Sequence, residues 1–174
     1  VERTGVIGVA PSARRGASMV IQSQRTACVY GGESGSRTRL SDMHLLHLGS
    51  GAGSTPRWSH VVYDSVAPAA RTQHSATLVP RLSDADGAEL MLVFGGVGQD
   101  NEPLGDLHAF DFETRKWEQL TPAGSTPAAR KGHTATLVLG SLVAIFGGSD
   151  QVGPVLYNDL YLLDLRRRVW IEPA

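Results

Sequence analysis

The chain has 174 residues, and its 16 Lys and Arg against 17 Asp and Glu give a formal net charge of −1. This near-neutral balance argues against a general binder of nucleic acids or anionic membranes, because such a protein would carry a basic excess. The glycines and prolines make up about one residue in six, which predicts many tight turns, and the single Cys28 excludes a disulfide framework and a cysteine-based zinc site.

Four landmarks recur three times along the chain. Each repeat has an arginine, then an apolar run that closes on two glycines, then an Asp, and finally a tryptophan. The arginine-to-glycine interval is 17, 24 and 17 residues, and the glycine-to-Asp interval is 11, 11 and 12. These intervals define a unit of about 52 residues with two short insertions, at 49–56 and 80–87. The landmarks are Arg14, Gly31, Gly32 and Trp58, then Arg71, Gly95, Gly96 and Trp117, then Arg130, Gly147, Gly148 and Trp170.

Each unit predicts four short strands bounded by turn residues. The first strand covers 16–22, 73–79 and 132–139, the second 26–31, 89–95 and 141–147, and the third 42–48, 106–112 and 159–165. A fourth strand begins near each tryptophan. The second strands are almost continuously apolar, which is typical of strands buried on both faces. Tandem four-stranded units are typical of the blades of a β-propeller.

The unit boundaries divide the chain into blades at 11–67, 68–126 and 127–174, within one incomplete propeller domain. We interpret 1–10 as the outer strand of a preceding blade and its linker. Three blades leave an apolar face at each end. We therefore expect further blades of the same parent chain, or a second copy of this chain, to cover these faces.

The landmarks resemble the kelch repeat. The best match runs from Asn158 through Trp170, after the apolar run that ends at Gly148, while His44 and His108 stand where Tyr161 does. The resemblance implies an all-β fold, namely a kelch-type β-propeller segment of three four-stranded antiparallel blades. It also implies a non-catalytic module that binds protein partners. The alternative is the propeller part of a larger enzyme, such as a fused phosphatase or methyltransferase or a sugar epimerase or mutarotase, with catalytic residues outside this chain.

Antiparallel strand order places two kinds of loop on one face of the blades: those between second and third strands, and those that enter each first strand. Variable polar side chains on rigid strands are typical of a binding surface, and we expect a protein partner to contact this face. The candidates in the 33–40, 97–105 and 149–157 loops are Arg37, Arg39, Asp100, Asn101, Glu102, Asp150 and Gln151.

The repeated Arg14, Arg71 and Arg130 allow two interpretations. In the kelch propellers that the chain resembles, arginines near this position bind acidic peptides, and a guanidinium suits this role because it binds a carboxylate through two parallel hydrogen bonds. Alternatively, each arginine ties its own blade to the next through backbone carbonyl groups. Lysine at these positions would separate the two roles, because it keeps the positive charge but cannot form the two parallel hydrogen bonds of a guanidinium.

The remaining polar residues give no catalytic signature. The chain has no G-x-S-x-G, no P-loop and no G-x-G-x-x-G motif. His74 and His133 share a position in the first strand, where a histidine that holds a loop by hydrogen bonds is favoured over a metal ligand. We therefore expect no catalytic residue, no metal and no cofactor, no direct nucleic-acid or membrane contact, and an intracellular, cytoplasmic location that suits a lone thiol.

Overall fold

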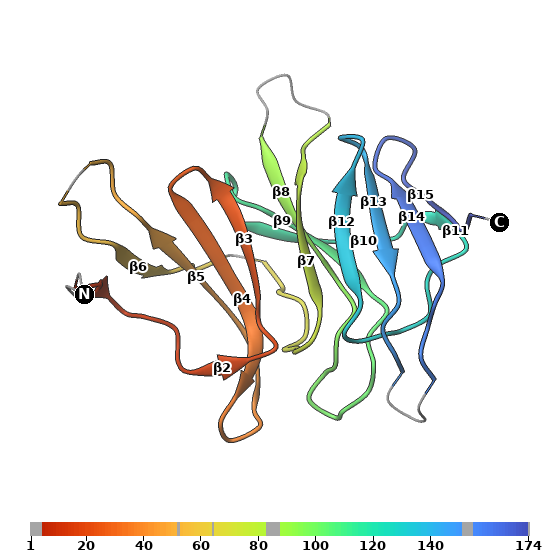
Figure 1. The fold of residues 1–174 in the computed structure, drawn as a ribbon, viewed down its shortest axis with the longest axis horizontal. Coiled ribbons are helices and arrows are strands. Elements are labelled where there is room, and N and C mark those ends of the chain that lie inside the picture. The colour runs from red at the N-terminus through yellow and green to blue at the C-terminus, as the bar shows by residue number, and fades with distance from the viewer. Residues whose placement is uncertain (1–4, 52, 64, 83–87, 151–154, 174) are drawn as a thin grey trace.

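A computed structural model describes residues 5–51, 53–63, 65–82, 88–150 and 155–173. These residues form three twisted β-sheets that stand side by side, with no helix among them (Figure 1). Each sheet is one blade built on four antiparallel strands, and short additional strands extend the sheets of the first and third blades. The predicted all-β propeller segment is therefore confirmed.

The strands of each blade follow one another in sequence order. Blade 1 contains β3 (Ser18–Ser23), β4 (Thr26–Ser34), β5 (Arg39–His47) and β6 (Arg57–His60), and β2 (Arg14–Arg15) pairs with the end of β4. Blade 2 contains β7 (Ser75–Pro80), β8 (Glu89–Phe94), β9 (Leu107–Asp111) and β10 (Lys116–Leu120). Blade 3 contains β12 (Thr134–Val138), β13 (Leu142–Phe146), β14 (Leu160–Asp164) and β15 (Val169–Ile171). The first strands β3, β7 and β12 lie next to one another, since β7 contacts both of the others.

Two further short strands lie on the outer edges of blades. β11 (Ala123–Gly124) leaves blade 2 and pairs in parallel with β15, and β1 (Ile7–Gly8) pairs in parallel with β6. After the fourth strand of one blade, the chain crosses to the first strand of the next blade. On the way it pairs briefly with the fourth strand of that next blade, as β11 does with β15. Residues 7–8 therefore lie along the outer edge of blade 1, at the position that β11 takes along blade 3. The interpretation of 1–10 as the outer strand of a preceding blade and its linker stays a prediction.

Aromatic rings pack in both interfaces between blades. Tyr30 of blade 1 lies 5.4 Å from the ring of His74 and 5.0 Å from Trp117, measured between ring centroids. The next interface repeats this arrangement with Phe94, which lies 5.3 Å from His133 and 5.7 Å from Trp170. Such large buried rings contribute much of the apolar area of a core. The repeated sequence landmarks thus place equivalent rings at both interfaces.

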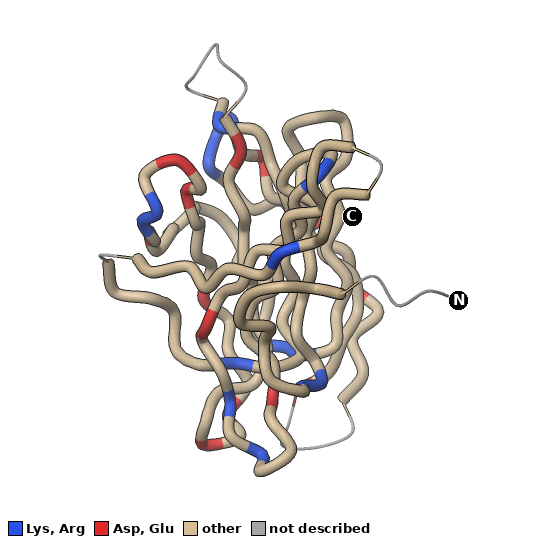
Figure 2. The backbone as a smooth tube through the Cα atoms, turned by 90° about the vertical axis from the view of Figure 1, so that its left-hand side faces the viewer, with Lys and Arg blue, Asp and Glu red and all other residues tan. Residues whose placement is uncertain are grey.

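The end blades expose apolar side chains that are covered in the middle of the structure. Phe146 occupies the position of Phe94 but is 53% exposed, and Met19 and Ile21 are 59% and 61% exposed on blade 1. Figure 2 views the structure from the blade 1 side, with charged residues mainly toward the two ends, where the loops lie. The expectation that further blades or a second copy cover these faces stays a prediction.

Candidate functional site

The loops expected to bind a partner lie together at the lower side of Figure 1. We call this surface the loop face and define it as the described residues within 11–17, 33–40, 68–74, 97–105, 127–133 and 149–157. The turns at the other end of each blade form the opposite face. The rigid sheets between them fix the positions of the loops.

A glycine pair at the end of each second strand allows the blades to approach closely. Gly95 and Gly96 have φ of 64° and 97°, and a Cβ on Gly95 would lie 2.6 Å from the carbonyl oxygen of Arg130 in the next blade. The Gly96 N–H donates to the Arg130 carbonyl of the next blade at 2.8 Å. A residue with a side chain would be strained in this conformation and would block this bond. The equivalent pairs Gly31 and Gly32, and Gly147 and Gly148, also have positive φ.

The repeated arginine braces the loop within its own blade. Arg71 is fully buried and donates to the Gly95 carbonyl at 3.0 Å and to both carboxylate oxygens of Asp106 at 2.7 Å. Its own carbonyl accepts the N–H of Gly32 from the preceding blade. The side chain therefore closes one blade while the backbone joins two. Arg14 and Arg130 repeat the side-chain contacts with Gly31 and Asp42, and with Gly147 and Asp159.

These ion pairs keep both partners charged. Burial on its own would raise the pKa of Asp42, but hydrogen bonds from Arg14 and His44 outweigh it and lower the pKa to about 2. At Asp106 burial is likewise outweighed by hydrogen bonds from Arg71 and His108, so the pKa is lowered. Because each guanidinium fork already holds a carboxylate, this geometry favours the structural interpretation of the arginines. A partner contact by Arg14, Arg71 and Arg130 stays a prediction.

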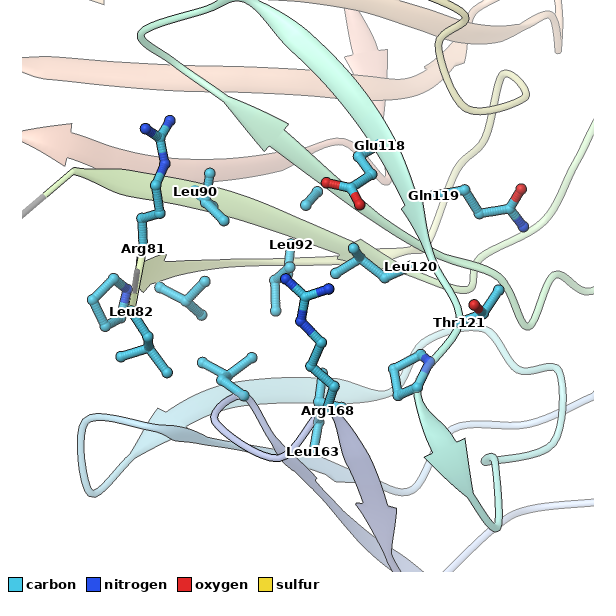
Figure 3. Close-up of a pocket in the computed structure, with 15 residues that line it drawn as sticks. Arg81, Leu82, Leu90, Leu92, Glu118, Gln119, Leu120, Thr121, Leu163 and Arg168 are labelled. Atoms are coloured by element: carbon cyan, nitrogen blue, oxygen red, sulfur yellow. The ribbon is translucent and has the colours of Figure 1, made fainter. Parts of the chain in front are cut away.

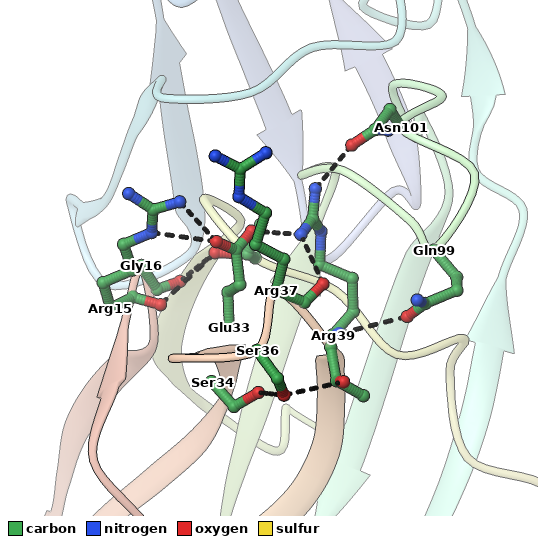
Figure 4. A network of polar contacts seen from close by, with 11 residues as sticks. Arg15, Gly16, Glu33, Ser34, Ser36, Arg37, Arg39, Gln99 and Asn101 are labelled. Carbon is green, nitrogen blue, oxygen red and sulfur yellow. Dashed lines mark hydrogen bonds and ion pairs between the residues drawn. The ribbon is translucent and has the colours of Figure 1, made fainter.

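Arg15, the residue beside the first of these arginines, places an exposed charge on the loop face. Arg15 is paired with Glu33, yet its side chain is 76% exposed, whereas the Glu33 side chain is 6% exposed (Figure 4). Arg39 pairs with the other oxygen of Glu33. The hydrogen bond from Arg15 is the largest of the influences that lower the pKa of Glu33, so this carboxylate stays ionised between two cations. The group carries one net positive charge.

The same network joins the loops of two blades. Arg39 donates to the Asn101 side-chain oxygen at 2.6 Å, and its backbone N–H donates to the Gln99 side chain at 3.0 Å. Both partners belong to the blade 2 loop. This contact fixes the relative position of two predicted site residues, Arg39 and Asn101.

The other predicted loop residues are dispersed over the same face. Arg37, Asp100 and Glu102 are exposed at the loop tips, and Asp150 is half-buried. Gln151 lies outside the described residues. Their role in binding a partner stays a prediction.

The structure adds residues that the repeat pattern passed over. A polar cavity of about 380 Å³ lies in the loop face and is lined by Arg15, Glu33, Arg39, Gln73 and Lys131, among others. Arg15, Thr72 and Lys131 each follow the repeated arginine. That position differs between units, and such variation is the signal that would have identified them.

Arg37 offers a direct test of strain in this surface. Its φ is 61°, a left-handed conformation that Asn tolerates better than Arg. We expect Arg37→Asn to raise the free energy of unfolding by about 0.5–1 kcal/mol. Urea unfolding at pH 7 measures this change. The control is Arg166→Asn in the opposite-face turn after β14; an equal gain there would rule out relief of strain at residue 37.

The two first-strand histidines hold neighbouring blades together. His74 Nε2 lies 2.8 Å from Ser18 Oγ, and His133 Nε2 lies 2.8 Å from Ser75 Oγ. A hydrogen-bonding role of these histidines is confirmed, but each partner is a serine in the first strand of the neighbouring blade rather than a loop residue. Among the described residues, no three His, Cys, Asp or Glu side chains form a group that could hold a metal ion. Cys28 is buried, and this burial raises its pKa to about 12.

Stacked four-stranded blades with variable polar loops on one face define the class of this protein as a β-propeller segment. Over residues 1–174 the chain matches the family model described as the KLHDC2/KLHL20/DRC7 Kelch-repeats domain. The chain belongs to the kelch-repeat family, which confirms the resemblance seen in its repeats. Kelch-repeat domains are generally non-enzymatic modules that bind protein partners.

Curated relatives contain the same kind of repeat within longer proteins. The chain is 33% identical over 143 residues to Kelch domain-containing protein 3 of Bos taurus, which covers 80% of this chain and 35% of that protein. It is 30% identical over 141 residues to Acyl-CoA-binding domain-containing protein 4 of Arabidopsis thaliana, covering 81% of this chain and 19% of the relative. It is 33% identical over 101 residues to the Rho GTPase-activating protein gacHH of Dictyostelium discoideum, covering 58% and 6%. The chain thus spans about a third or less of these relatives.

No helix in the described residues is long and apolar enough to cross a bilayer.

Proposed function

We propose that this chain binds a protein partner through the loop face, with the Arg15–Glu33–Arg39 group as the centre of the contact. The observation that carries this proposal is the exposed Arg15 guanidinium, held in place by a buried carboxylate at the rim of a polar cavity. A positioned guanidinium binds a carboxylate with directional, charge-assisted hydrogen bonds. Arg37 adds a further positive charge at the loop tip.

The charge of this surface favours a segment of the partner that carries acidic side chains. Around the loops of blade 1 and the adjoining cavity, basic side chains outnumber the acidic Glu33, although the total charge of the chain is −1. The basic residues are Arg15, Arg37, Arg39 and Lys131. Complementary charge accelerates encounter and disfavours basic partners. The alternative, in which the propeller serves a larger enzyme, stays a prediction that sequencing the reading frame around this chain tests directly.

Selection of peptides from a randomised display library against the immobilised chain tests the proposal. We expect the selected peptides to be rich in Asp and Glu, and to bind an Arg15→Gln, Arg37→Asn double variant about 3- to 10-fold more weakly. The matched control is Arg166→Gln, Arg167→Asn, which removes the same charge from exposed residues on the opposite face. Peptides that lose affinity only for the control variant would assign binding to the opposite face instead.

A further inference from the structure

A second cavity lies between blades 2 and 3, near their opposite-face turns and away from the loop face. Its volume is about 240 Å³, and leucine is the most frequent residue in its wall (Figure 3). The leucines are Leu82 in the turn after β7, Leu90 and Leu92 on β8, Leu120 at the end of β10, Leu163 on β14, and Leu165 just after β14. The cavity is therefore an apolar slot between two packed sheets.

The cavity exists because this interface lacks rings that the other interface contains. Between blades 1 and 2, Phe110 lies 5.3 Å from Phe112 and 6.3 Å from Tyr63. Counting from the repeated Asp and Trp, the residues that correspond to Phe110, Phe112 and Tyr63 are Leu163, Leu165 and Pro122. All three are smaller, and all three line the cavity. The chain's own aromatic cluster thus indicates what would fill the empty slot, namely an aromatic ring system.

One cation at this cavity has no partner in the described part of the chain. Arg168 lines the cavity, and in Figure 3 its side chain extends toward Leu92. Arg81 also lines it but pairs with Asp111 and Glu113. Glu118 supplies the acidic group in the wall. The guanidinium of Arg168 is therefore the group available to a ligand anion.

We propose that this cavity binds a small aromatic acid, with its ring between the leucines and its carboxylate against Arg168. Apolar walls with one placed polar group are the usual composition of a small-molecule site. The cavity volume of about 240 Å³ lies just below the range of roughly 300–1,000 Å³ for such sites, which suits a ligand of one or two fused rings. This site is separate from the loop face, so it does not depend on the proposed protein partner.

Titration with 2-naphthoate, followed by NMR of isotope-labelled leucine methyl groups, tests the proposal. We expect a Kd on the order of 1 mM and shifts at Leu92, Leu120 and Leu163. The neutral 2-naphthylmethanol and the cationic 2-naphthylmethylamine carry the same ring, and both should bind more weakly than the acid. An amine that binds as tightly as the acid would overturn the role of Arg168.

Two substitutions separate the ring site from the charge. Leu165→Phe supplies the ring that Phe112 provides at the other interface, and should weaken binding at least about 10-fold while the melting temperature is kept or raised. Arg168→Asn suits the local φ of 54° and should weaken the acid about 2- to 5-fold while leaving the alcohol unchanged. The proposal is wrong if shifts concentrate at Leu160, which pairs with the exposed Phe146 and is itself 40% exposed, because the probe would then bind the exposed apolar face of blade 3.

The reciprocal variant Phe112→Leu provides a positive control. It removes a ring at the filled interface and should open an equivalent slot, visible as new naphthoate shifts at the methyl groups of Leu45 and Leu78, which pack against that core. Binding that stays unchanged in both Leu165→Phe and Phe112→Leu would show that ring volume at the interfaces does not control the site.

Discussion

Replacing Arg71 with methionine is expected to lower the free energy of unfolding by about 3–5 kcal/mol. The loss arises because Asp106 and the Gly95 carbonyl keep their positions but lose the guanidinium that satisfies them. A group left without its buried partner costs more than the pair contributed. Urea unfolding followed by tryptophan fluorescence measures the change, since Trp117 lies in the neighbouring core.

The conservative variant Arg71→Lys distinguishes the two roles of this position. Lysine keeps the charge but cannot hold both carboxylate oxygens and the carbonyl in one plane, so we expect about half of the loss caused by methionine. The surface variant Arg166→Met should change stability by less than about 0.5 kcal/mol. A stable Arg71→Met variant that no longer binds the selected acidic peptides would favour ligand contact instead.

Stability should fall by about 3–4 kcal/mol between pH 7 and pH 5 through His74 and His133. Burial is the main cause that lowers the pKa of His74 to about 3 and that of His133 to about 4, and the charges of Arg71 and Arg130 lower them further. The folded protein keeps both rings neutral at pH 5, whereas the unfolded chain protonates both below its pKa near 6.5. Since the unfolded state binds more protons, this part of the stability is complete above pH 6.5 and is lost as the pH falls toward 4 and 3.

Urea midpoints at pH 7, 6 and 5 measure this dependence. A His74→Gln, His133→Gln double variant should be less stable at pH 7, because it disturbs the contacts with Ser18 and Ser75, but its midpoint should change much less with pH. The paired Asp42 and Asp106 contribute in a lower window, since their lowered pKa values lead to a loss of stability only below about pH 4. A wild-type midpoint that stays constant from pH 7 to pH 5 would show that these histidines accept protons in the folded state.

The candidate site was predictable in position but only partly in composition. Strand order alone placed Arg37, Arg39 and Asn101 on one face, because successive antiparallel strands return their loops to alternate ends. The repeat singled out Arg14 but not its neighbour Arg15, which carries the exposed charge. Their side chains leave the strand on opposite sides, so one braces the Asp42 carboxylate and the other reaches solvent.

The sequence by itself determined the blade architecture, because the spacing of Gly pairs, Asp and Trp repeats wherever equivalent strands, turns and rings are needed. Only the tertiary structure decided which side chains and cavities remain available to bind a partner or ligand. Three features depend on contacts across loops or blades. These are the pairing of Glu33 with two arginines, the hydrogen bond from Arg39 to Asn101, and the cavity beside Leu165. Such contacts join residues far apart in the chain, and their geometry follows from how the sheets stack rather than from any local pattern.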